Sequence, residues 1–375
     1  MADMIPFIDL LAQRARIKER TDAAVAKVLD EGRYILGPEV AELEEKLSEF
    51  AGIGRTLSCA NGTDAILIPL MAWGIGPGDA VFVPSFTFAS TAEVVVLAGA
   101  SPVFVDIDPD TYNMSPESLE AAIDAVKAEG ALNPKAVIAV DLFGQPADYP
   151  RLEPVARKHG LKLVSDCAQG FGCTLGDKAS LHWADVLTVS FYPAKPLGAY
   201  GDGGAILCKD DALYDAMKSV RVHGEGKARY EYARIGLNSR LDTIQAAILL
   251  AKLEVFREEI EMRQRVADAY AAGFGNAVKL PHIIAGAQST WAQYTVEVED
   301  RDAFRAHLAE QGVPTAIYYP IPLHMHEPYA GYPRAPGGLP ATEAAANRVV
   351  SLPMHPDMPQ ADIERVVAAV TGFRS

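Results

Sequence analysis

The sequence predicts an α/β protein in which a mostly parallel, doubly wound sheet forms a large domain and a small α+β domain follows. Three observations predict it. Short β-prone runs alternate with helical stretches as far as residue 208. A long amphipathic helix is expected from residue 243 to about 272 and would link the two domains. The chain of 375 residues is 49% hydrophobic, which is enough for a large core. We expect the domains to be residues 1–255 and 256–375.

The elements follow in order from hydrophobic periodicity and turn residues. An extended arm precedes two N-terminal helices, and Gly37-Pro38 opens the second of them. The predicted strands are 79–84, 102–106, 136–142, 162–165, 185–190, 204–208 and, in the small domain, 293–298. The predicted helices are 13–29, 39–50, 65–73, 90–98, 115–127, 149–159, 243–272, 301–311 and 360–371. Residues 217–231 are polar and basic with two glycines, so we expect a mobile loop there.

Charge and composition exclude several classes of protein. The formal net charge of −15 argues against a general nucleic-acid or anionic-membrane surface. No apolar run approaches the roughly 20 residues that a transmembrane helix needs. The four cysteines form no CxxC pair and the N-terminus lacks signal-peptide features, so we expect reduced thiols and a cytoplasmic protein. His324 and His326 lack acidic or cysteine partners, and we expect no metal.

Three motifs at the ends of predicted elements point to one kind of chemistry. Lys195 follows a buried strand, where lost hydration lowers a lysine pKa and leaves an amine able to form a Schiff base. A lone lysine in a Gly/Pro turn is usually a surface residue, but Asp166 also ends a strand. Gly62-Thr63 opens a helix whose N-terminus suits a phosphate. A pyridoxal phosphate (PLP) site needs these three contacts: an imine lysine, an aspartate for the pyridine nitrogen and a phosphate cradle.

The order of these motifs resembles the DegT/DnrJ/EryC1/StrS family of sugar aminotransferases. The resemblance rests on Gly62-Thr63, on Asp166-x-Ala-Gln169 and on Ser190-Phe-x-Pro-x-Lys195-x-Leu-Gly-x-x-Gly-Asp-Gly-Gly204, and it runs from Ile5 to roughly Met358. It implies fold type I of the PLP-dependent transferases, which is like that of aspartate aminotransferase. It also implies a ping-pong transaminase that uses PLP and pyridoxamine phosphate (PMP), with L-glutamate as the donor and a nucleotide-linked keto-sugar as the acceptor.

The resemblance also implies roles for single residues. Lys195 would carry the cofactor and act as general base, and Asp166 would pair with the pyridine nitrogen. Gly62, Thr63 and Ser190 would contact the phosphate, with Asn238 reaching it from the second subunit of a homodimer. Gln169 would lie beside the ring hydroxyl, and Phe88 would stack on the ring. Phe86 stays an alternative, because two residues apart in an extended segment point the same way. The substrate contacts implied are Tyr34, Arg240, Tyr318, Tyr319 and His324.

Within the family, the pattern is most similar to members that aminate C3 of UDP-2-acetamido-2-deoxy-3-oxo-glucuronate for surface polysaccharide such as lipopolysaccharide O-antigen. Gln169 favours C3, since many C4 enzymes carry histidine there. Tyr318 departs from the pattern, because those members usually have a histidine and a neutral phenol adds no positive charge. The alternatives are a 3-aminotransferase for a dTDP-3-oxo-6-deoxyhexose and a C4 aminotransferase. A PLP sugar dehydratase, in which histidine replaces the lysine, and a non-catalytic regulator are less favoured.

Overall fold

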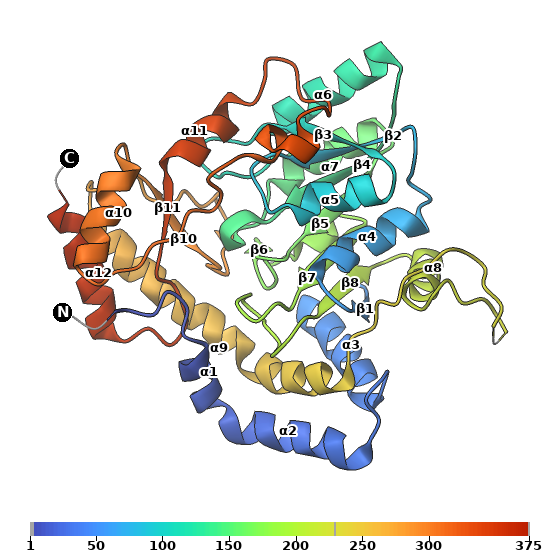
Figure 1. The fold of residues 1–375 in the computed structure, drawn as a ribbon, viewed down its shortest axis with the longest axis horizontal. Helices are drawn as coiled ribbons and strands as arrows, with labels where there is room; N and C mark the ends of the chain where they lie inside the picture. The colour runs from blue at the N-terminus through green and yellow to red at the C-terminus, as the bar shows by residue number, and fades with distance from the viewer. Residues whose placement is uncertain (1–3, 229, 374–375) are drawn as a thin grey trace.

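The computed structural model describes residues 4–228 and 230–373 and is built around a seven-stranded sheet (Figure 1). The strand order is β1-β8-β7-β5-β4-β2-β3. β8 runs antiparallel to both of its neighbours, and the pairings from β7 to β3 are parallel, which confirms the mostly parallel sheet. The strands are β1 Arg55–Cys59, β2 Asp79–Pro84, β3 Ser101–Val105, β4 Asn133–Val140, β5 Lys162–Asp166, β7 Val186–Ser190 and β8 Gly204–Cys208.

Helices cover both faces of this sheet because successive side chains of a strand point to opposite faces. Leu187 and Val189 of β7 pack in a core with α3 (Pro38–Ala51) and the first part of α9 (Thr243–Phe274). Val186 points the opposite way and packs in a larger core, to which residues of five further helices contribute: α4 Gly62–Ala72, α5 Ser90–Leu97, α6 Pro116–Glu129, α7 Tyr149–Lys158 and α8 Asp211–Arg221. Of these, α7 lies on the Leu187 face, because its Tyr149 hydroxyl donates to the hydroxyl of Ser165, the sheet partner of Leu187, at 2.6 Å.

A separate core lies in the C-terminal part of the chain. Figure 1 shows α9 running from the sheet to this part. Its later residues, such as Tyr270 and Phe274, pack there with Tyr294 and Phe304. The surrounding elements are β10 Tyr294–Glu297, α10 Arg301–Glu310, β11 Val349–Leu352 and α12 Gln360–Gly372. Helix α11 (Pro340–Arg348) packs instead in a small cluster with Phe86 and Val140. The pairing of β10 with β11 is antiparallel. The short elements of the fold are β6 Thr174–Leu175, β9 Ala287–Gln288, η1 Leu142–Gly144, η2 Ser180–His182, η3 Leu323–Met325 and η4 Glu327–Tyr329.

The packing departs from the predicted division at residues 255 and 256, which falls inside α9. Ile5 is 1% exposed and belongs to the C-terminal core, where its amide donates to Gly312 O at 3.0 Å. In the other direction, Leu323 and Leu339 pack in the core of the sheet. The N-terminal arm therefore belongs by packing to the small domain, and part of the C-terminal chain belongs to the large one.

Some predicted elements were wrong in detail. The helix expected at 13–29 is two helices, α1 (Leu10–Arg16) and α2 (Lys18–Glu31), because Ile17 leaves helical geometry at φ −114° and ψ 16°. The loop expected from residue 217 begins later, since Met217 is buried in the last turns of α8. Strand β1, helix α8, helix α11 and strand β11 were not predicted. Among the described residues, none of the helices has the length and apolar character to cross a membrane.

Ile5→Ala tests the place of the N-terminal arm. Removing a buried isoleucine side chain should lower the free energy of unfolding by about 2–5 kcal/mol, as measured by urea denaturation. The neighbouring Met4 is 76% exposed, so Met4→Ala should change that free energy by less than about 0.5 kcal/mol. Equal, negligible effects of both changes would show that the arm does not stabilise the core.

Candidate active site

The N-terminus of α4 and the end of β7 form one cradle. A Cβ atom added to Gly62 would lie 2.6 Å from Ser190 Cβ and 2.8 Å from its hydroxyl oxygen, so the helix start and Ser190 are in direct contact. The Asn61 side chain caps the helix by accepting from the Asp64 amide at 2.8 Å. Thr63 lies in the first turn. The structure thus places Gly62, Thr63 and Ser190 together, with the amides of a helix N-terminus beside them, which suits a phosphate.

Lys195 lies in the loop between β7 and β8, whose two ends are paired at Ser190 and Gly204. Inside the loop, the Lys195 amide donates to Tyr192 O at 2.8 Å. The side chain is partly buried. Burial lowers the pKa of Lys195, and the nearby Asp166 carboxylate partly opposes this shift. A lowered pKa favours the neutral amine that nucleophilic attack on a carbonyl requires.

Asp166 is 3% exposed at the end of β5, next to β7 in the sheet. Its Oδ1 accepts from the Ala168 amide at 3.1 Å, and its Oδ2 accepts from the Thr91 hydroxyl at 3.3 Å. Burial raises the pKa of Asp166, against the effects of the Ala168 amide, Lys195 and Thr91. A buried carboxylate of this kind is suited to a cationic partner, because a nearby positive charge stabilises its ionised form.

Gln169 is 4% exposed and held at both ends of its amide. Its Oε1 accepts from the Phe143 amide at 2.8 Å, and its Nε2 donates to the Tyr319 hydroxyl at 3.1 Å.

The two candidates for stacking on the cofactor ring, Phe86 and Phe88, differ sharply in exposure. Phe86 is 1% exposed and packs among aromatic rings, whereas Phe88 is 56% exposed with its ring 6.5 Å from that of Tyr319. Phe88 is therefore the one of the two with a free ring face, and its stacking role stays a prediction.

The predicted substrate residues fall into two groups. Tyr34, Asn238 and Arg240 lie at the surface of this chain, where Arg240 Nε donates to Asn238 Oδ1 at 2.9 Å. The segment of Asn238 and Arg240 is close to the cradle, since the Ala60 amide donates to the Ser239 hydroxyl at 3.2 Å. Tyr318 packs against the rings of Phe7 and Tyr319 in the C-terminal part of the chain. Tyr319 contacts Gln169, so these aromatic residues reach the same site.

His324 lies deeper than a substrate contact would. It is 7% exposed, with Nδ1 2.7 Å from the Ser85 hydroxyl and Nε2 3.4 Å from Glu343 Oε1. Burial lowers the pKa of His324. Its substrate role stays a prediction, and these contacts favour a role in packing.

Sequence reasoning missed the residues that hold the site from afar. Thr91 donates to Asp166, and Thr290 donates its hydroxyl to Gln169 O at 2.8 Å from 121 residues away. No sequence motif marks a threonine as the partner of a distant residue. For Thr91 one signal existed: it stands three residues after Phe88, the predicted ring contact, and could therefore have been placed near the cofactor. No comparable signal existed for Thr290.

The residues present fit PLP. The start of α4 approaches Ser190 too closely at Gly62 for any side chain, the amides of this helix N-terminus are beside that contact, and Asp166 is buried beside Lys195. Lys195 would hold the aldehyde carbon, Asp166 the pyridine nitrogen, and Gly62, Thr63 and Ser190 the phosphate.

Gly62→Ala tests the cradle. The added methyl group would collide with Ser190, and overpacking that costs about 1–3 kcal/mol should weaken PLP affinity by about tenfold to a hundredfold in a fluorescence titration. Gly76→Ala is the matched control, since its added Cβ would meet its nearest atom at 3.6 Å. An unchanged PLP affinity in Gly62→Ala would contradict the placement of the phosphate at this position.

The comparisons with known proteins agree with this site. Residues 15–371 match the DegT/DnrJ/EryC1/StrS aminotransferase family. The chain is 48% identical over 369 residues to the UDP-2-acetamido-2-deoxy-3-oxo-D-glucuronate aminotransferase of Pseudomonas aeruginosa, covering 98% of this chain and 100% of that protein. It matches the crystal structure of a family aminotransferase from Brucella abortus with a TM-score of 0.97 and 53% identity, over 98% of this chain and 99% of the other.

The cofactor also appears among the structural relatives. NtdA from Bacillus subtilis, solved with bound PMP, matches with a TM-score of 0.88 and 28% identity, over 99% of this chain and 85% of that one. The fold is therefore fold type I of the PLP-dependent transferases, as predicted. The chain belongs to the DegT/DnrJ/EryC1/StrS aminotransferase family and is a PLP-dependent aminotransferase.

Proposed function

We propose that this enzyme transfers an amino group from L-glutamate to C3 of UDP-2-acetamido-2-deoxy-3-oxo-glucuronate. The observation that carries the proposal is the 48% identity to the Pseudomonas aeruginosa aminotransferase named for that sugar, over 98% of this chain. Two features of the site support it. Gln169 stands where C4 enzymes often carry histidine, and Arg240 offers a guanidinium that can bind a carboxylate in a bidentate manner.

The residues of the chain divide the work of amino transfer. Bound PLP supplies an electron sink that makes the α-proton of the donor acidic. The Nζ atom of Lys195, once free, can take that proton and return it, because its lowered pKa favours the neutral base. The ionised Asp166 carboxylate would stabilise a proton on the pyridine nitrogen by charge attraction. Gly62, Thr63 and Ser190 would hold the phosphate.

We propose a homodimer in which Asn238 and Arg240 complete the site of the partner subunit. Both residues lie in a segment that is largely exposed in this chain, and Ile235 beside them is 84% exposed. Large apolar side chains are also exposed at Tyr34 and Phe88 near the site. A second copy would cover such apolar surface. A cytoplasmic location and a role in lipopolysaccharide O-antigen synthesis belong to this same proposal.

Tyr318 favours a second candidate, the 3-amination of a dTDP-3-oxo-6-deoxyhexose. Burial raises the pKa of Tyr318, so its phenol stays neutral and offers no charge to a uronate. Three further functions have weaker support. Gln169 argues against a C4 enzyme, Lys195 argues against a dehydratase, and the assembled Lys195, Asp166 and phosphate cradle argue against a protein without catalytic function.

Arg240→Ala separates the two sugar substrates. With the UDP-linked uronate, kcat/KM should fall by roughly one to a few orders of magnitude, because the carboxylate loses its guanidinium partner. With the dTDP-linked deoxyhexose it should stay nearly unchanged. The control is Arg265→Ala, at an exposed position of α9, which should leave both values unchanged. Dimerisation and PLP content are checked for each variant. Equal losses with both sugars would assign Arg240 to the nucleotide or to the fold.

The two half-reactions test the function itself. L-glutamate should abolish the visible absorbance of the Lys195-bound cofactor, and the UDP-linked 3-keto-uronate should restore it while the dTDP-linked 3-keto-deoxyhexose does not. Recovery with the deoxyhexose alone would establish the second candidate. Absence of any response to glutamate would contradict the roles of both Lys195 and the donor.

A further inference from the structure

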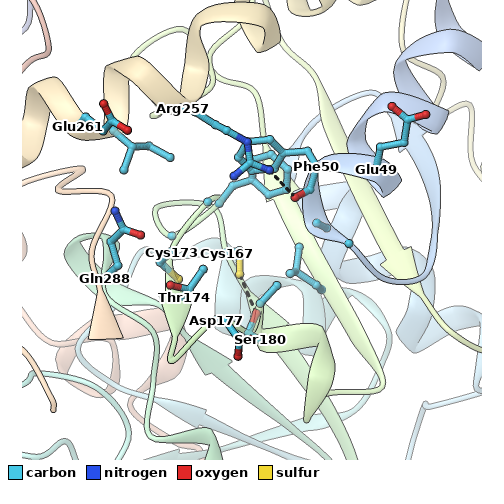
Figure 2. Close-up of a pocket in the computed structure, with 18 residues that line it drawn as sticks. Glu49, Phe50, Cys167, Cys173, Thr174, Asp177, Ser180, Arg257, Glu261 and Gln288 are labelled. Atoms are coloured by element: carbon cyan, nitrogen blue, oxygen red, sulfur yellow. Dashed lines mark hydrogen bonds between the residues drawn. The ribbon is translucent and has the colours of Figure 1, made fainter. Parts of the chain in front are cut away.

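Asp166 and Gln169 lie on one turn, residues 166–173, which we call the cofactor turn. A cavity of about 380 Å³ lies behind it (Figure 2). Cys167, Phe171 and Cys173 line the cavity from the turn, and Phe50 of α3 and Arg257 of α9 are among the residues that line it from the helices. The neighbouring helices therefore do not pack fully against the back of the turn. The Phe171 ring still packs against Phe50 at 5.3 Å and Phe256 at 6.0 Å between ring centroids, so polar contacts fix the turn together with this apolar packing.

The carboxylate of Asp141 is the centre of those contacts. Asp141 follows β4 and is 0% exposed. On one side, its Oδ2 accepts from the Cys167 thiol at 2.7 Å and from the Cys173 thiol at 3.6 Å. On the other, its Oδ1 accepts from the Tyr149 hydroxyl of α7 at 2.6 Å and from the Ala147 amide at 2.9 Å. One carboxylate thus ties the cofactor turn to α7.

Backbone amides at and beside Asp141 also form hydrogen bonds with Asp166 and Gln169 of the same turn. The Asp141 amide donates to Asp166 O at 3.0 Å, and the Phe143 amide donates to the Gln169 side chain at 2.8 Å. Gly170 lies against the Asp141 side chain so closely that an added Cβ atom would collide with it. Any shift of Asp141 therefore shifts Asp166 and Gln169.

We propose that Asp141 is a positioning residue for amino transfer, whose ionised carboxylate holds Asp166 and Gln169 in place through the thiols of Cys167 and Cys173. The proposal rests on the roles proposed above for Asp166 and Gln169, and it is independent of the identity of the sugar. Asp141 itself is separated from the reacting atoms by the turn and acts through its neighbours.

The charge of Asp141 depends on pH in the working range. Burial raises the pKa of Asp141 to about 6, against hydrogen bonds from Cys167, Tyr149, the Ala147 amide and Cys173. The titratable groups that face it are Tyr149 from α7 and the two thiols from the turn. Burial raises the pKa values of Tyr149 and Cys167, and the hydrogen bond with Cys167 together with burial raises the pKa of Cys173. All three are neutral donors.

Protonation of Asp141 should loosen the turn while stabilising the fold. A protonated carboxyl donates from one oxygen, so at least one of its donors loses its partner as the pH falls through about 6. The pKa is raised in the folded state, so the folded chain binds the proton more tightly than the unfolded chain. The contribution of this group to stability therefore grows as the pH falls from above 6 toward 3.8. A residue that only packs would change stability and cofactor affinity in the same direction.

Asp141→Asn tests the proposal in the full-length enzyme. The amide keeps the shape and lacks the charge, and Nδ2 donates where Oδ2 accepted. Near neutral pH we expect PLP affinity to fall by about tenfold or more, because hydrogen bonds to a charged group are lost. The melting temperature of the apoenzyme should not fall. The loss of wild-type PLP affinity below about pH 6 should flatten in the variant.

Two further variants serve as matched controls. Tyr149→Phe removes a hydrogen bond from the α7 side of Asp141, so it should lower the melting temperature and change PLP affinity by less than about threefold. Cys167→Ala removes a donor on the turn and should weaken PLP binding, whereas Cys167→Ser should restore it. The serine rescue decides the matter if Asp141→Asn does not fold.

The proposal is overturned if Asp141→Asn binds PLP like the wild type with the same pH profile. It is also overturned if Asp141→Asn and Tyr149→Phe lose affinity and melting temperature in parallel, or if Cys167→Ala binds PLP normally. These titrations use no sugar, so a failure of the substrate assignment would leave them unaffected.

Discussion

The site depends on holding a lysine and a carboxylate side by side with little water. Asp166 is the last residue of β5 and Lys195 follows β7, and because these are adjacent parallel strands, both residues lie at the same edge of the sheet. Burial lowers the pKa of Lys195 and raises the pKa of Asp166, and each group partly opposes the shift of the other. The lowered pKa suits the role proposed for Lys195, which requires a neutral amine. The raised pKa acts against the role proposed for Asp166, which requires an anion and therefore a nearby cation such as a protonated pyridine ring. Buried charges of this kind rarely stabilise a fold, so the surrounding structure must hold them.

That surrounding structure is one packing unit rather than separate motifs. β8 returns antiparallel to β7, so the loop that carries Lys195 is closed at both ends by the pairing of Ser190 with Gly204. Gly204 in turn approaches the backbone of Asn61 too closely for a side chain, and Asn61 caps α4. The loop that carries Lys195 and the phosphate cradle are therefore in direct backbone contact. A side chain at this contact would displace one of them, which explains why glycine occupies it.

Much of this could be predicted from the sequence, because the chemical residues stand at strand and helix ends where the local pattern is strong. Strands β2 and β8 begin and end at the predicted residues, and Lys195, Asp166 and Gly62 follow from the same kind of pattern. Period-two reasoning could not separate Phe86 from Phe88, because β2 ends at Pro84 and the following residues are not a strand. The break at Ile17 was hidden because apolar residues keep their helical spacing across it.

The contacts that sequence reasoning could not reach are the long-range ones. The local pattern places Asp141 in a strand, yet its carboxylate is the acceptor for residues 8, 26 and 32 positions away. Its partners are defined only when β4, β5 and α7 pack together.

Burial also gives the site a common pH dependence. In the proposed roles, Lys195 works as a free base, Asp166 works as an anion, and Asp141 holds the cofactor turn as an anion. Acid opposes all three, because it protonates the amine and neutralises both carboxylates. Burial raises the pKa of Asp166 and brings the pKa of Asp141 to about 6. As the pH falls, these two carboxylates are therefore protonated nearer to neutrality than exposed carboxylates would be. The lowered pKa of Lys195 moves the opposite way and extends the range in which its amine is free. The same desolvation thus sets both the reactivity of the lysine and the acid limit of the groups that support it.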